Sequence, residues 1–225
     1  MENSKKIKIA VDAMGGDYAP ENVIEGAIMA LRESNNRFEI VFVGDEEKIK
    51  NELRKYDTIG LSYSIVDAPQ VIGMDDIPTV ALRRKKNSSI VVGMKLHSDG
   101  EVDAFASAGN TGAVLTAATF ILGRIEGISR PTIGSVFPTE SGRKSIMLDV
   151  GANVDCKPNH LFEFAIMGSI YSSEILGQKN PKVALLNIGE ESTKGGDVVL
   201  QAYQLLSESK LNFAGNVEGR DILLG

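Results

Sequence analysis

The chain has 225 residues, about one and a half times the length of an average domain, so it forms one large domain or two small ones. Its 24 Lys and Arg against 30 Asp and Glu give a net charge of −6, which argues against a protein held to nucleic acid by bulk charge. The single cysteine, Cys156, excludes an internal disulfide and any zinc site built from several cysteines. No apolar run is long enough to span a bilayer, and residues 1–8 are too polar for a signal peptide, so we expect a cytoplasmic protein.

Apolar, β-branched runs alternate with longer amphipathic stretches along the whole chain. The predicted strands are residues 7–11, 40–43, 61–66, 102–106, 145–150, 183–188 and 211–215. The predicted helices are residues 21–32, 46–55, 78–86, 88–97, 111–122, 159–176 and 196–206, with Pro20 and Asp45 as start signals for the first two. The run at 40–43 is continuously apolar, which predicts that it is covered on both faces.

This alternation predicts a three-layer α/β/α fold with a mostly parallel sheet and helices on both faces. No linker, repeat or low-complexity tract marks a boundary, so residues 1–225 are treated as a single α/β domain. A further element begins near Gly219 and stops without a cap or polar tail. We therefore expect a chain that lacks the C-terminal part of a larger fold and tends to self-associate.

Two glycine-containing loops follow predicted strands. The first, Asp12-Ala13-Met14-Gly15-Gly16-Asp17, is equally typical of a tight turn and of a loop that approaches a ligand. The second, residues 107–113, leads directly into a helix, where free backbone N–H groups and the side chains of Ser107, Asn110 and Thr111 could bind an anion. The alternative is that Asn110 or Thr111 only caps its own helix.

The only dense basic cluster is Arg83-Arg84-Lys85-Lys86, which is followed by Asn87-Ser88-Ser89. It is either a solvated helix end or a set of cations that meets a helix start at an anion site. Lys194 lies in a loop between a strand and a Gly-Gly helix start, where it is either an electrophile and proton donor or an ordinary surface lysine. Cys156 has no histidine near it in the sequence and is interpreted as structural.

Five motifs, taken together and in this order, resemble the PlsX family of phosphate acyltransferases from bacterial phospholipid synthesis. They are residues 9–17, 83–89, 107–112, 149–153 and the string Gly215-Asn216-Val217-Glu218. Each motif alone is a weak signal, but the resemblance runs over essentially the whole chain. The family is longer by roughly a third, so the chain is similar to its N-terminal two-thirds.

The resemblance implies a fold akin to the isocitrate dehydrogenase and phosphotransacetylase group. It also implies reversible transfer of a fatty acyl group from acyl carrier protein to inorganic phosphate, which gives acyl-phosphate without a metal or redox cofactor. The expected partners are acyl carrier protein, phosphate and a second copy of the chain in a homodimer, with no nucleic acid. A peripheral association with a membrane acyltransferase, at the inner face of the membrane, is a further expectation.

The resemblance assigns the catalytic role to Lys194. The residues assigned to phosphate or substrate binding are Asp12, Gly15, Gly16, Asp17, Arg84, Asn87, Ser88, Ser107, Gly109, Asn110, Thr111, Gly112 and Asn153. We expect Asn110→Leu to abolish phosphate dependence without unfolding the protein. Two alternatives are a truncated, non-catalytic chain of the same fold and a nucleotide-cofactor-dependent α/β enzyme; the second is disfavoured because no loop reads GxGxxG.

Overall fold

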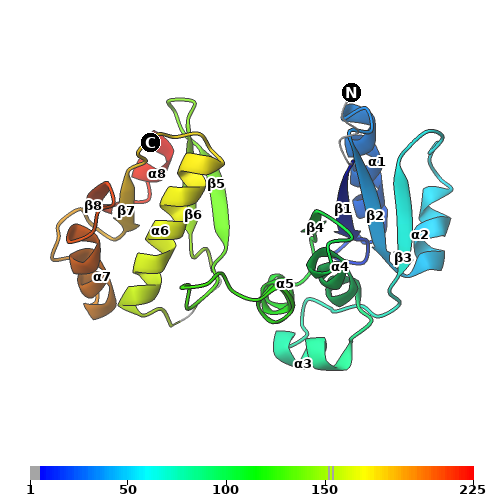
Figure 1. The fold of residues 1–225 in the computed structure, drawn as a ribbon, viewed down its shortest axis with the longest axis horizontal. Helices are drawn as coiled ribbons and strands as arrows, with labels where there is room; N and C mark the ends of the chain where they lie inside the picture. The colour runs from blue at the N-terminus through cyan, green and yellow to red at the C-terminus, as the bar shows by residue number, and fades with distance from the viewer. Residues whose placement is uncertain (1–5, 152, 154) are drawn as a thin grey trace. The chain divides into compact units, whose positions relative to one another are not determined.

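The computed structural model describes residues 6–151, 153 and 155–225, and these fall into two compact units that divide between Gly123 and Arg124 (Figure 1). Ala152 of the motif at 149–153 and the first five residues of the polar N-terminus lie outside the described residues. The single domain expected over residues 1–225 stays a prediction, and each unit is described by itself.

The first unit is built on a four-stranded parallel sheet with the order β3-β2-β1-β4. Its strands are β1 (Ile7–Asp12), β2 (Phe38–Gly44), β3 (Tyr63–Asp67) and β4 (Ala104–Ala106). Its helices are α1 (Glu21–Glu33), α2 (Glu46–Leu53), α3 (Pro78–Arg84), α4 (Ser89–Ser98), α5 (Thr111–Ala117) and the π-helical turn η1 (Ala118–Leu122).

Both faces of this sheet are buried, as the apolar run at 40–43 predicts. Ile40 and Phe42 of β2 pack against one cluster that includes residues of α1 and α2. Val41 and Val43 point to the opposite face, into a cluster against which residues of α4 pack. A side chain points to alternate faces along a strand, so a strand buried on both sides must be apolar throughout.

The second unit contains an antiparallel pair, β5 (Gly134–Pro138) with β6 (Lys144–Leu148), and a parallel pair, β7 (Val183–Leu186) with β8 (Phe213–Val217). Its helices are α6 (Pro158–Glu174), α7 (Asp197–Ser207) and the short α8 (Asp221–Leu224). Helix α6 contacts β6, β7 and α7 (Figure 1). In the part of the chain that the structure describes, no helix is both long and apolar enough to cross a membrane.

The predicted alternation of strands and helices and the mainly parallel sheet are confirmed. Asp45 caps α2 by accepting a hydrogen bond from the Lys48 backbone N–H at 3.1 Å. Strand β5 is absent from the predicted strands, because its segment Gly-Ser-Val-Phe-Pro has only two large apolar residues between a glycine and a proline. The predicted helix over 111–122 is helical throughout, but its last turn is of the π type.

Candidate functional site

The strand order of the first unit reverses between β1 and β4. From β1 the chain adds β2 and then β3 on one side, and β4 pairs with β1 on the other side. In open parallel sheets, ligands bind beyond the carboxyl ends of the strands at such a reversal. The loops that leave these two strand ends are residues 12–17 and 107–112, the two glycine-containing loops that the sequence singles out.

Hydrogen bonds join these two loops through Asp12 and Ser107. The Ser107 hydroxyl donates to Asp12 Oδ2 at 2.7 Å and accepts from the Gly109 backbone N–H at 3.0 Å. The other carboxylate oxygen, Asp12 Oδ1, accepts from the Met14 backbone N–H at 3.1 Å. Asp12 is only 1% exposed. The side chains of Asp12 and Ser107 therefore hold the loops together.

Gly15 lies where the two loops are closest. A Cβ atom at this position would lie 2.4 Å from Asp12 Oδ2 and 2.8 Å from the Gly109 backbone nitrogen, both inside van der Waals contact. Gly16 adopts a φ of 101°, a conformation that L side chains rarely adopt. The glycine pair thus permits a tight turn and a close approach of one loop to the other, while Asp17 remains exposed at the rim.

The side chain of Asn110 forms all of its hydrogen bonds within the protein. Its Oδ1 accepts from the Ala113 backbone N–H at 2.9 Å, which caps α5. Its Nδ2 donates toward the carbonyl oxygens of Gly73, Met74 and Asp76 at 3.1, 3.0 and 3.2 Å. The capping alternative is therefore observed, and the side-chain amide has no N–H left for a phosphate. Assignment of Asn110 to phosphate binding stays a prediction that rests on its backbone N–H.

The start of α5 still offers donors. Thr111 is exposed, and the N–H groups of Thr111 and Gly112 lie in the first helical turn, where an α-helix supplies no backbone acceptor. Gly112 packs against α3, since a Cβ there would lie 2.9 Å from Pro78 Cγ. Together with the Asn110 backbone N–H, these two backbone groups are the part of loop 107–112 that remains suited to an anion.

The residues of the basic cluster at 83–86 have different surroundings in the structure. Lys85 is turned inward, where its Nζ donates to Asp76 Oδ2 at 2.5 Å and to the Val71 carbonyl at 2.8 Å. The Lys85 ammonium, followed by the Gly73 backbone N–H, lowers the pKa of Asp76. Arg83 and Arg84 are exposed and form no ion pair with the residues the structure describes.

Ser88 and Asn87 differ in accessibility. Ser88 is fully buried as the N-cap of α4 and accepts from the Val91 backbone N–H at 3.4 Å. Asn87 is exposed, and its backbone N–H donates to Gln70 Oε1 at 2.9 Å. Binding of phosphate by Ser88 stays a prediction, but the hydroxyl is inaccessible in this structure.

The segment at residues 70–76 ties these elements together, although no pattern in the sequence singled it out. Gln70 holds the start of α4, Asp76 holds Lys85, and the carbonyls of this segment receive Asn110. These partners lie 9 to 37 residues apart, and no motif links them. The one available signal is the turn-forming run Gly73-Met74-Asp75-Asp76, which is separated from the helix-starting Pro78 by Ile77 alone.

In the second unit, Asp149 organises the loop after β6. It adopts a φ of 67°, and its two carboxylate oxygens accept from Asn153 Nδ2 at 2.8 Å and from the Cys156 thiol at 3.1 Å. Burial, and then the Asp149 carboxylate, raise the pKa of the Cys156 thiol to about 11. The thiol is thus protonated at neutral pH, which supports its interpretation as structural, and the Asn153 amide is engaged by Asp149.

Lys194 lies in the loop that connects β7 to α7. Its side chain is 47% exposed, and its Nζ is 4.0 Å from Glu191 Oε1, a weak surface ion pair. The ammonium is therefore accessible to an anionic ligand. Its catalytic role stays a prediction.

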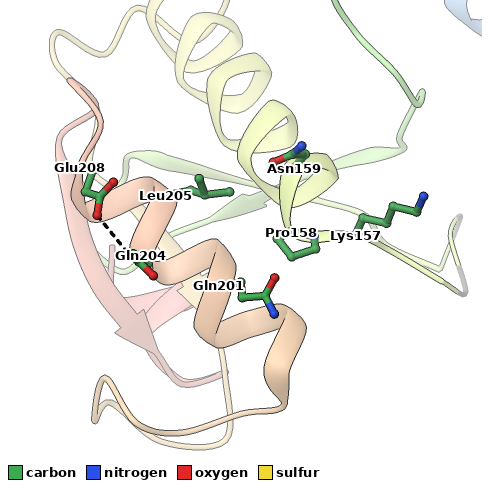
Figure 2. Close-up of a pocket in the computed structure, with 7 residues that line it drawn as sticks. All are labelled: Lys157, Pro158, Asn159, Gln201, Gln204, Leu205 and Glu208. Carbon is green, nitrogen blue, oxygen red and sulfur yellow. Dashed lines mark hydrogen bonds between the residues drawn. The ribbon is translucent and has the colours of Figure 1, made fainter.

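A hollow of about 450 Å³ also lies in this unit, between the start of α6 and the side of α7 (Figure 2). Polar and apolar groups both line it: Lys157, Pro158, Asn159, Gln201, Gln204, Leu205 and Glu208. Gln204 Nε2 donates to Glu208 Oε1 at 3.1 Å across one helical turn. None of the residues assigned to substrate or catalysis from the sequence lines it.

Solved structures with a similar fold define the fold class of this chain. A phosphotransacetylase from Streptococcus pyogenes matches 96% of this chain with a TM-score of 0.68 at 20% identity. The match covers 69% of the phosphotransacetylase chain. The EutD phosphotransacetylase from Staphylococcus aureus matches 95% with a TM-score of 0.62 at 21% identity, again covering 69% of its length. The chain therefore has the α/β fold of the phosphotransacetylases.

The family is defined by sequence. The chain belongs to the family described as fatty acid synthesis protein, whose model matches residues 7–225, and this confirms the resemblance to the PlsX family. It is 52% identical over 219 residues to the phosphate acyltransferase of Desulforamulus reducens and 51% identical over 219 residues to that of Bacillus licheniformis. Each alignment covers 97% of this chain and 65% of the relative, so the chain spans less than two thirds of these relatives' length.

Proposed function

We propose that the complete protein transfers a fatty acyl group from acyl carrier protein to inorganic phosphate and releases acyl-phosphate for phospholipid synthesis. The observation that carries this proposal is the identity of about half of all residues, over 97% of the chain, to proteins named phosphate acyltransferase. The fold is consistent with this proposal, because the two solved structures with a similar fold are named phosphotransacetylases, a name that refers to an acyl group and phosphate.

The proposed reaction sets the demands on the site. A phosphate oxygen attacks the thioester carbonyl carbon, and an oxyanion forms on the carbonyl oxygen. The carbon–sulfur bond then breaks, the thiolate of the carrier leaves and takes up a proton, and a carbon–oxygen bond to phosphate remains. Such a reaction needs an anion site for phosphate and donors or cations for the developing negative charge. It consumes neither an oxidant nor a reductant.

Candidate residues are assigned in each unit by itself. For phosphate, we assign the backbone N–H groups of Thr111 and Gly112 beyond the carboxyl ends of β1 and β4, with Gly15 and Gly109 shaping that edge. For the developing charge, we assign the half-exposed ammonium of Lys194. The proposed partners are acyl carrier protein, a second copy of the chain and, peripherally, a membrane acyltransferase in a cytoplasmic setting.

The test is phosphate-dependent release of free carrier protein from acyl carrier protein by the purified complete protein. We expect a rate that saturates with phosphate, and a fall of about 10²–10³ in Lys194→Ala because a charge-stabilising contact is lost. Thermal stability should change little, since the side chain is about half exposed. Lys210→Ala, an exposed lysine beyond the far end of α7, is the control and should keep wild-type turnover.

Two outcomes contradict this proposal separately. A release rate that is independent of phosphate would refute acyl transfer to phosphate. Phosphate-dependent turnover that Lys194→Ala reduces by less than about threefold would keep the reaction but make Lys194 only a surface charge.

A further inference from the structure

The motif Gly215-Asn216-Val217-Glu218 has no role in the function proposed above, yet Asn216 is only 6% exposed. It lies in β8, opposite Leu185 of β7, one residue before the strand ends. Its Nδ2 donates to the Glu191 carbonyl oxygen at 2.8 Å, across 25 residues of sequence. A buried amide at the end of one strand thus reaches the loop that leaves the neighbouring strand.

A second amide holds the same loop from β7. Asn187, the residue directly after this strand, donates from Nδ2 to the Lys194 carbonyl oxygen at 2.9 Å. Between the two attachment points, the Lys194 backbone N–H donates to the Glu191 carbonyl at 3.0 Å. Two side-chain amides and one backbone hydrogen bond therefore define the path of the chain from Glu191 to Lys194.

Apart from these hydrogen bonds, the loop near Glu191 has an exposed contact between the Arg220 guanidinium and Glu190 Oε1 at 3.4 Å, which contributes little because both side chains are in solvent. Residues 190–198 are all exposed, so apolar burial does not hold them, and the Lys194 ammonium has only its 4.0 Å pair with Glu191 among the residues described. Gly195, with a φ of 98°, leaves room for the Asn187 side chain, because a Cβ atom at this position would lie 3.2 Å from Asn187 Nδ2. The two amides are therefore the main attachments of the lysine's backbone to the sheet.

The two polar atoms of the Asn216 amide differ in their contacts. Its Oδ1 is buried and has no hydrogen-bond partner among the residues the structure describes. Its Nδ2 forms the hydrogen bond to the Glu191 carbonyl, so the contribution of this amide to the loop comes from its donor.

We propose that Asn216 and Asn187 are positioning residues that clamp the loop at Glu191 and Lys194 and so hold the Lys194 ammonium in place for the reaction. The catalytic part of this inference rests on the proposed function, whereas the clamp itself does not. A cation contributes most to charge stabilisation when it is already in position, because no reorganisation is then needed during the reaction.

The clamp is tested without any activity assay by limited trypsin digestion of the complete protein, following the fragment cut after Lys194 by mass spectrometry. Asn216→Asp replaces the donor with a carboxylate facing the Glu191 carbonyl. We expect cleavage after Lys194 to be about tenfold faster, as the loss of one net hydrogen bond predicts for local opening. Asn212→Asp is the matched control, because Asn212 Nδ2 donates to the Asn180 carbonyl at 3.0 Å just before β8 begins.

Equal cleavage rates in wild type and Asn216→Asp would overturn the clamp, as would the same acceleration in Asn212→Asp. Asn187→Asp tests the second attachment and should accelerate the same cut. Far-ultraviolet circular dichroism monitors folding of each variant. Loss of the fold in both Asn216→Asp and Asn187→Asp would also overturn the proposal, because it would make the amides determinants of stability.

The catalytic part is tested by a double-mutant cycle in the complete protein. Asn216→Asp should lower kcat at least about tenfold when Lys194 is present and should have no further effect in the Lys194→Ala background. A purely structural role would lower activity by the same factor in both backgrounds and would overturn this part. Absence of phosphate-dependent turnover in the wild type would instead refute the proposed function, and the trypsin experiment would still report on the clamp.

Discussion

Gly15 sets the separation of the two loops beyond β1 and β4. Its Cβ would come within 2.8 Å of the Gly109 backbone, which cannot move away like the end of a flexible side chain. We expect Gly15→Ala to lower the free energy of unfolding by about 1–3 kcal/mol, the usual range for overpacking, and to weaken phosphate saturation. Urea denaturation measures the first effect.

Gly26→Ala is the matched control for this prediction. Gly26 lies on the exposed side of α1, and a Cβ added there would meet no other atom within 4 Å, so alanine should raise stability by about 0.5–1 kcal/mol. Equal effects of the two substitutions would contradict the close packing at Gly15.

Cys156 provides a pH-dependent prediction. A pKa of about 11 leaves about 1 in 1,000 thiols ionised at pH 8, roughly 100-fold less than for a thiol with a pKa of 9.0. Alkylation of this single cysteine should therefore be slow at pH 8 and rise about tenfold per pH unit up to about pH 10. Asp149→Asn removes the carboxylate and should accelerate the reaction. A rate that levels off near pH 9 would contradict the raised pKa.

Among the elements, α5 depends on a residue that belongs to no helix. Asn110 caps α5 and also binds three carbonyls of the segment at 73–76, with 7% of its surface exposed. The sequence-based expectation that Asn110→Leu leaves the fold intact does not agree with these contacts, because leucine would remove the cap and break the hydrogen bonds to the three carbonyls.

We therefore expect Asn110→Leu to lower the free energy of unfolding by about 1–3 kcal/mol, from the lost cap and the lost hydrogen bonds to segment 73–76. Thermal or urea denaturation measures this loss. Asn22→Leu, an exposed residue of α1 with no side-chain hydrogen bond among the described residues, is the control and should change stability by less than about 0.5 kcal/mol. A stable Asn110→Leu variant would show that segment 73–76 is held by other contacts.

At the scale of the whole molecule, each unit presents its assigned residues at strand ends. In the first unit, the reversal of strand order between β1 and β4 brings residues 12–17 and 107–112 together. In the second, β7 and β8 end side by side, and their asparagines hold the Lys194 loop. Parallel strands place all their carboxyl ends at one edge, so loops that are distant in sequence converge there.

The sequence by itself determined the family and most of the elements, but not strand β5. Hydrophobic periodicity, the Asp45 cap and the strand-end glycines are local signals, because each depends on neighbours within a few residues. The tertiary structure alone decided which polar groups are already engaged. Ser107 and Asp12 are 95 residues apart, and Asn216 and Glu191 are 25 apart. Whether such a side chain binds a ligand or the protein depends on the groups that folding brings beside it, and no local pattern encodes those neighbours.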